Sequence, residues 1–222
     1  WNLLFRDFNE KHGKGDIGYT PGEKIAIKVN LNNQYSAFID PYIKQDNERD
    51  ASPYLTKALL KELTDTVGIN QTDITIYDAS RKMGNWFYNR VYYQNYPTTP
   101  LTPEYPNIHY VDKAGEAPGR EQAQPSQQLI YFSDGLTRTL PTCVTEADYL
   151  INIPILKMHP INHGVTLSGK NFYGTWIEPV VKVHPYHIDG LTMGNPTPQT
   201  DLLAHEHIGG KTLLYLGDGL YG

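Results

Sequence analysis

Residues 24–31 read KIAIKVNL, and this stretch decides the fold together with the two segments that follow it. Its apolar residues stand at every second position, which is the pattern of a β-strand with one strongly apolar face. Residues 52–63, SPYLTKALLKEL, predict a helix, because Ser52 can serve as its N-cap and Pro53 suits the first helical position. Residues 74–78, ITIYD, predict a second strand. Strand, helix and strand in this order predict a βαβ unit with two parallel strands.

The rest of the chain extends this sheet around an irregular middle. Residues 148–156, DYLINIPIL, form a nearly continuous apolar run that suits a central parallel strand, and Pro154 should end it. Residues 211–216 predict a last strand. Residues 84–128 are rich in aromatic residues, Asn and Pro, and we predict an irregular inserted lobe there. We therefore expect a single α/β domain over residues 1–222, built on an open, mostly parallel Rossmann-like sheet.

Composition and charge narrow the classes of function. The chain carries 19 Lys and Arg against 24 Asp and Glu, a formal net charge of −5, so nucleic acid is not expected as a partner. No apolar run approaches the roughly 18 residues that cross a bilayer. The single cysteine, Cys143, excludes an intrachain disulfide and an iron–sulfur cluster ligated by cysteines within this chain. A small buried side chain is the favoured interpretation of Cys143, ahead of a catalytic thiol.

Polar side chains follow the predicted strands at their carboxyl ends, which meet at one edge of a parallel sheet. They are Lys28 and Asn30 from the first strand, Asp78 and Ser80 after the second, Lys157 and His159 after the third, and Asp218 after the last. We expect them to bind a small anionic ligand, a divalent metal, or both, with His159, Asp78 and Asp218 as candidate metal ligands. Lys28 leaves two interpretations open, a residue of this site or a lysine at an edge or solvent-facing position.

Residues 165–174, VTLSGKNFYG, add a second polar group close to the first. Lys170 and Asn171 could direct an ammonium and an amide toward an anion, and a surface lysine at a helix end is the other interpretation. Thr166 is a further candidate for ligand binding. Six of the eight histidines lie between positions 159 and 207, but their spacing matches no strong zinc motif. No phosphate loop, dinucleotide fingerprint or nucleophile elbow is found.

Three passages resemble the domain-of-unknown-function 362 family, residues 22–30, 148–159 and 165–174. The shared series is a strand followed by Lys-x-His, then Thr, Lys-Asn and Gly. The resemblance covers nearly the whole chain and implies an α/β fold, often in an exported protein. Relatives continue beyond the point that matches Gly219, so the chain looks truncated at both ends. The family has no established activity, so its Lys-x-His and Lys-Asn residues are implied only as site residues.

Functions from different classes stay open at this point. The first is an enzyme, or enzyme remnant, that acts on a small anionic or oxygen-rich substrate. Lys157 and Lys170 would then bind anionic groups, His159 would serve as general base or ligand, and Asp78 would orient or coordinate. The second is a noncatalytic exported module that holds a glycan or a protein partner with the aromatic section. A third is a subunit of a larger assembly.

Overall fold

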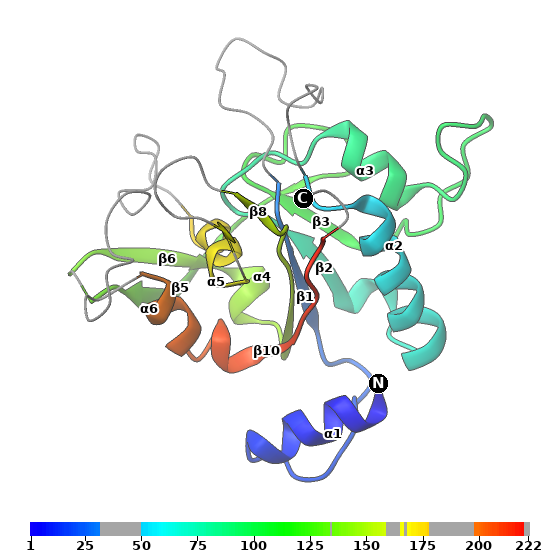
Figure 1. Ribbon diagram of the computed structural model, residues 1–222. Coiled ribbons are helices and arrows are strands. Elements are labelled where there is room, and N and C mark those ends of the chain that lie inside the picture. The colour runs from blue at the N-terminus through cyan, green and yellow to red at the C-terminus, as the bar shows by residue number, and fades with distance from the viewer. Residues whose placement is uncertain (32–49, 134, 159–164, 167, 178–197, 220–222) are drawn as a thin grey trace.

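The centre of the protein is an open, parallel sheet, as the sequence predicts. The computed structural model describes residues 1–31, 50–133, 135–158, 165–166, 168–177 and 198–219. Six strands lie in the order β10-β7-β1-β2-β3-β4, and every neighbouring pair is parallel. Figure 1 shows this sheet between two layers of other elements. The Rossmann-like α/β fold is therefore confirmed.

The strands and helices of the protein have the following bounds. The sheet consists of β1 (Ile25–Val29), β2 (Ile74–Tyr77), β3 (His109–Asp112), β4 (Glu121–Gln122), β7 (Tyr149–Ile153) and β10 (Thr212–Tyr215). Two antiparallel ribbons pair β5 (Pro125–Tyr131) with β6 (Thr137–Pro141) and β8 (Lys157–Met158) with β9 (Val165–Thr166). The helices are α1 (Asn2–Lys11), α2 (Pro53–Lys61), α3 (Asn85–Tyr92), α4 (Thr142–Thr145), α5 (Ser168–Asn171) and α6 (Pro198–Ala204). Shorter turns are the π-helix η1 (Glu62–Val67) and the 3-10 helices η2 (Gln71–Asp73), η3 (Phe172–Gly174) and η4 (Gly209–Lys211).

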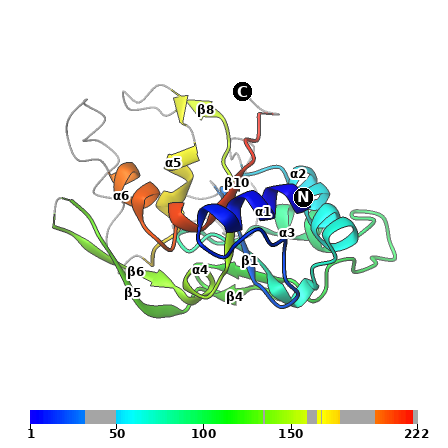
Figure 2. The same cartoon turned by 90° about the horizontal axis from the view of Figure 1, so that it is seen from below.

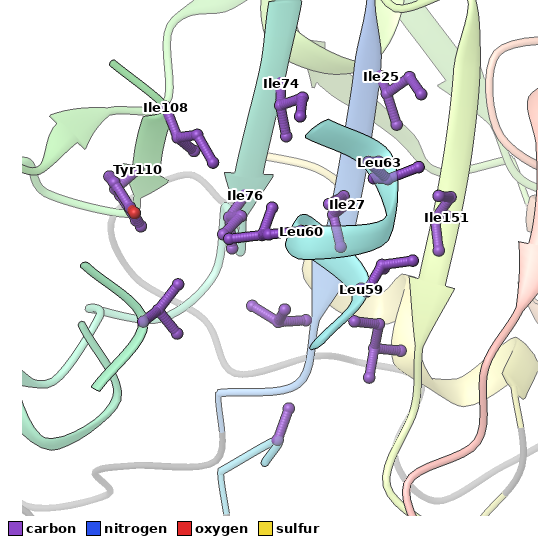
Figure 3. Close-up of a cluster of buried hydrophobic side chains, with 14 of the residues drawn as sticks. Ile25, Ile27, Leu59, Leu60, Leu63, Ile74, Ile76, Ile108, Tyr110 and Ile151 are labelled. Atoms are coloured by element: carbon purple, nitrogen blue, oxygen red, sulfur yellow. The ribbon is translucent and has the colours of Figure 1, made fainter. Parts of the chain in front are cut away.

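The alternation in residues 24–31 separates two apolar cores, one on each face of the sheet. Ile25, Ile27 and Val29 pack with Leu59 and Leu60 of α2 in one cluster, which also receives side chains from α1 and α3. Figure 3 shows the α2 leucines lying over the isoleucines of neighbouring strands. Burying each such side chain stabilises the fold by about 1.5–3 kcal/mol relative to leaving it exposed, so this face anchors the sheet.

The opposite face is covered by the β5–β6 ribbon, α4, α5, η3 and α6, which lie across the sheet from α2 and α3 (Figures 1 and 2). Ala26 of β1 and Leu150 of β7 join its core together with Phe172, Trp176 and Leu202. Lys28 belongs to the same face by strand alternation, because it stands two residues after Ala26. A lysine therefore lies beneath the layer that contains α5 and η3.

The predicted start of α2 and the predicted end of β7 are both confirmed. The Ser52 hydroxyl accepts a hydrogen bond from the Leu55 amide at 3.3 Å and caps α2, with Pro53 as the first helical residue. β7 ends at Ile153, immediately before Pro154, as expected from the missing N–H of proline. No helix within the described residues is both long enough and apolar enough to span a membrane.

The middle section differs from the irregular lobe that the sequence predicts. Residues 84–128 supply α3, β3 and β4, and their aromatic rings Phe87, Tyr88, Tyr105 and Tyr110 are buried in the core beneath α2 and α3. β3 and β4 extend the main sheet. β3 has only four residues and β4 only two, so their own patterns do not show that they join the main sheet.

Candidate functional site

The strand order places a topological switch point at β1. From β1 the chain extends the sheet through β2, β3 and β4 in one direction, and later through β7 and β10 in the other. Ligand sites of open α/β sheets lie at the carboxyl ends of the strands on either side of such a point. Here the register aligns Lys28 of β1 with Asn152 of β7 and with Tyr77 of β2. The polar residues of β1, β2 and β7 therefore meet at this edge.

Lys28 is the buried centre of this meeting point. Its side chain is 1% exposed, so the alternative of an edge or solvent-facing lysine is wrong. Its Nζ donates to the Val29 carbonyl at 2.6 Å, to Asp78 Oδ2 at 3.0 Å and to Asn171 Oδ1 at 3.5 Å. These three acceptors match the three N–H groups of an ammonium. Burial lowers the pKa of Lys28, and the adjacent Asp78 opposes that effect.

Asp78 receives donors on both carboxylate oxygens. Oδ1 accepts hydrogen bonds from the Ser80 amide at 2.9 Å and the Ser80 hydroxyl at 2.8 Å. Oδ2 accepts from Lys28 and from the Leu31 amide, the latter at 3.3 Å. An ionised carboxylate can accept about four hydrogen bonds, and these four donors fill all of those positions. In this arrangement Asp78 acts as the partner of Lys28.

Asn171 ties α5 to the ends of two strands. Its Nδ2 donates to Asn152 Oδ1 at 2.6 Å, to the Ile153 carbonyl at 3.2 Å and to the Lys28 carbonyl at 3.3 Å. Asn152 in turn donates to the Ser168 carbonyl at 3.0 Å. The α5 backbone is therefore fixed above β1 and β7 by side-chain amides, and the position of the neighbouring Lys170 follows from it.

Gly174 closes the buried network from above. A Cβ at this position would lie 2.6 Å from Asp78 Oδ1 and 2.7 Å from Lys28 Nζ, closer than real Cβ contacts allow. Its carbonyl accepts a hydrogen bond from the Ala79 amide at 2.8 Å. Sequence reasoning did not assign roles to Gly174 or Asn152. The signal for Asn152 was present, because a lone amide interrupts the apolar run of residues 148–156.

Lys157 and Lys170 lie at the same edge but are only partly buried. β8 pairs with β9 so that Lys157 faces Thr166, and α5 begins two residues after Thr166. Lys170 Nζ lies 3.6 Å from the centroid of the Tyr173 ring, within range of a cation–π contact. Burial lowers the pKa of Lys170 to about 8, and the charge of Lys157 adds to the shift.

Charge repulsion links four cations pair by pair, Lys170 with Lys157, Lys157 with Arg81 and Lys28, and Lys28 with Arg81. We call Lys28, Arg81, Lys157 and Lys170 the cationic cluster. Burial lowers the pKa of Lys157; the charges of Arg81 and Lys28 lower it further, while Asp50 and Asp78 raise it. Arg81 also lowers the pKa of Lys28. Groups that shift one another in this way lie close together. The structure thus brings together Lys28, Asp78, Ser80, Lys157, Lys170 and Asn171 from the predicted set.

The other predicted site residues are Asn30, Asp218, Thr166 and His159. The Asn30 carbonyl accepts a hydrogen bond from the Ala51 amide at 2.7 Å. Asp218 is 1% exposed and accepts from the Ser52 amide at 2.6 Å, which fastens the segment after β10 to the start of α2. Thr166 pairs through its backbone, but its side chain and all of His159 lie outside the described residues.

Two of the three candidate metal ligands, Asp78 and Asp218, lie in the described residues. In the part of the chain that the structure describes, no three His, Cys, Asp or Glu residues group as a metal site would require. His159, one of the three candidate ligands, lies outside that part. A divalent metal therefore stays a prediction, as do catalysis and export.

A separate pocket of about 200 Å³ opens at the amino ends of the strands, near the starts of β1 and β2. Its lining includes Lys24, His109, Cys143 and Glu146. Lys24 Nζ lies 3.0 Å from a Glu146 oxygen, and His109 Nδ1 lies 2.8 Å from a Glu121 oxygen. Burial raises the pKa of the Cys143 thiol to about 12, so the reactive thiolate is disfavoured.

Comparison with known proteins yields one match. A family model described as "Domain of unknown function (DUF362)" matches residues 25–192, which is most of the chain. The matched range includes Lys28, Asp78 and the segments of Lys157 and Lys170, and the description names no ligand or reaction. No curated protein and no solved structure matches the chain.

Proposed function

The chain belongs to the domain-of-unknown-function 362 family, and with this as premise we propose that it binds a small anionic ligand at the carboxyl edge of its sheet. Lys157 and Lys170 contact the ligand. Lys28 and Asp78 shape the floor of the site and Asn171 holds α5 in place. The ligand carries a carboxylate or a phosphate, since an ammonium binds either one as a point charge.

The surroundings of Lys170 carry this proposal. Within the described residues its ammonium contacts the face of Tyr173, and Lys157 is the charged group that shifts its pKa. No carboxylate of the described chain forms an ion pair with it. Two partly buried cations destabilise one another, because repulsion strengthens as the effective dielectric constant falls. An anion bound between them removes that repulsion.

Lys28 supports the proposal by contrast. Its charge is neutralised by Asp78, and its hydrogen bonds are complete without a ligand. A buried ion pair of this kind with full hydrogen bonding is a structural feature. The attraction for an external anion therefore comes from Lys170, while the buried pair is part of the fold.

Calorimetric titration with inorganic phosphate and with oxalate tests the proposal. We expect Lys157→Met and Lys170→Met each to weaken binding at least tenfold, which corresponds to about 1.4 kcal/mol. Lys61→Met is the matched control, because Lys61 lies exposed on α2 and pairs with Asp65. Circular dichroism verifies that each variant is folded. Wild-type protein that binds neither anion, or site variants that bind as well as Lys61→Met, would overturn the proposal.

A further inference from the structure

A lysine amine attacks a carbonyl carbon only when it is neutral and held where a substrate can reach it. Lys170 is partly exposed and is held in place from several sides. Its helix is fixed on one side by the hydrogen bonds of Asn171 to the ends of β1 and β7. On the other side Gly169 packs against α6, where a Cβ would lie 3.2 Å from Gln199 Oε1. The ring of Tyr173 supports the Nζ itself at 3.6 Å.

We propose that Lys170 forms an imine with a small anionic carbonyl compound, such as a 2-oxo acid, whose charged group is bound by Lys157. This inference rests on the proposed function and deepens it, because it names the substrate class. It assigns the two lysines different tasks. Lys157 supplies a positive charge, and Lys170 supplies a nitrogen lone pair.

The charges around the two lysines support this division. Burial, Arg81 and Lys28 lower the pKa of Lys157, but Asp50 and Asp78 act against that shift and favour its charged form. Lys170 has no such acid among the described residues. The charged group on the adjacent α6, Asp201, accepts hydrogen bonds from Ser133, including one from its amide at 2.9 Å. Burial and the Lys157 charge lower the pKa of Lys170 to about 8, so a substantial fraction is neutral slightly above neutral pH.

Lys28 is unsuited to this chemistry although it is more deeply buried. All three of its N–H groups are engaged, and Asp78 stabilises its charge. An amine in that environment has no free lone pair and no room for a carbonyl carbon, since a single Cβ at Gly174 would already lie 2.7 Å from its Nζ. The amine that can react is therefore the partly exposed one.

The reaction is a condensation that requires no oxidant or reductant. The neutral Nζ attacks the carbonyl carbon, and a proton passes from nitrogen to oxygen to give a carbinolamine. The C–O bond then breaks as the nitrogen lone pair forms the C=N bond, and the hydroxyl takes the second nitrogen proton and leaves as water. Protonation of the imine nitrogen makes it an electron sink for the bonds next to the former carbonyl carbon.

Reductive trapping tests the inference on the whole chain. Protein is incubated with pyruvate or glyoxylate and reduced with borohydride, which adds hydride to an imine carbon and makes the link permanent. Intact mass and peptide mapping then locate the adduct. We expect one adduct at Lys170, at least tenfold above the level at the exposed Lys61. Lys170→Arg keeps a positive charge but should lose the adduct, whereas Lys61→Arg should keep it.

The outcomes separate the two proposals. Oxalate binding without an adduct at Lys170 overturns the imine and leaves the anion site intact. Labelling spread evenly over exposed lysines also overturns the imine. Absence of phosphate binding, of oxalate binding and of the adduct overturns the proposed function together with the inference. An adduct at Lys170 that persists undiminished in Lys157→Met overturns the assignment of Lys157 as the residue that binds the charged group of the substrate.

Discussion

Lys28 and Lys170 lie near the carboxyl ends of the same parallel strands and differ in what surrounds their ammonium groups. Lys28 is buried in the central strand with a carboxylate, a carbonyl and an amide oxygen as acceptors. Lys170 is partly exposed on a short helix and contacts an aromatic ring, with another lysine as its charged neighbour. The protein thus supplies the hydrogen-bond acceptors and the counter-ion of the Lys28 ammonium. Among the described residues it supplies no counter-ion for the Lys170 ammonium.

This difference assigns a structural role to Lys28 and a ligand-binding role to Lys170. A buried charge must have its partners supplied by the protein, because water cannot supply them, so the partners of Lys28 belong to the fold. A partly exposed cation can obtain a partner from solution. We infer that substitutions around Lys28 act on stability and that substitutions of Lys170 act on ligand binding. The following variants test that separation.

Asp78→Ala should have the largest effect on stability. It leaves the Lys28 ammonium buried without its anion, and breaking a buried pair in this way costs about 3–5 kcal/mol. Urea denaturation measures the loss in the free energy of unfolding. The matched control is Asp65→Ala, which removes the partner of an exposed lysine and should cost at most about 1 kcal/mol. Similar losses in both variants would show that the buried pair has no special role.

Gly174→Ala comes next, because it adds one methyl group against the same pair. The new carbon would meet Asp78 and Lys28 at distances that force them to move, and such overpacking costs about 1–3 kcal/mol. Gly217→Ala is the control, since no atom lies within 4 Å of its added carbon. A Gly174→Ala variant as stable as Gly217→Ala would mean that η3 lies farther from the pair than these distances require.

Much of the fold followed from patterns in the sequence that have a direct physical cause. Alternation in residues 24–31, the cap at Ser52 and the break at Pro154 act within a few residues, and each predicts its element. β3 and β4 escaped prediction as part of the sheet, because such short strands owe their pairing to neighbours distant in sequence. Local patterns cannot report a partner that tertiary packing provides.

The candidate site could be predicted from the topology of the sheet rather than from a sequence motif. Parallel strands bring their carboxyl ends to one edge, so Lys28, Asp78 and Lys157 could be grouped before any contact was known. The burial of Lys28 could not be read locally, because its alternate position equally suits a solvent-facing side chain. Gly174 could not be recognised locally either, because its need for a missing Cβ comes from Asp78, which follows β2 and lies far away in sequence.

The pH dependence of Lys170 provides the smallest expected effect and the sharpest contrast with an exposed lysine. Its pKa is about 8 in the folded chain, against an ordinary value of 10.5. Between these values the unfolded chain binds more protons, so wild-type stability should rise with pH relative to Lys170→Met. Partial exposure limits the rise to about 1 kcal/mol or less. The measurement is the difference in free energy of unfolding between the two proteins across the window bounded by these two pKa values.

Lys61→Met is the control for this slope as well. Asp65 raises the pKa of Lys61, so the stability that the ion pair adds is present at lower pH and is lost as the pH rises through that pKa. The wild-type advantage over Lys61→Met should therefore not grow in the window where that over Lys170→Met does. Saturating phosphate should move the Lys170 window to higher pH, because a bound anion favours the charged amine. A slope for Lys170→Met that matches the control would mean that its ammonium is as well solvated as one on the surface of α2.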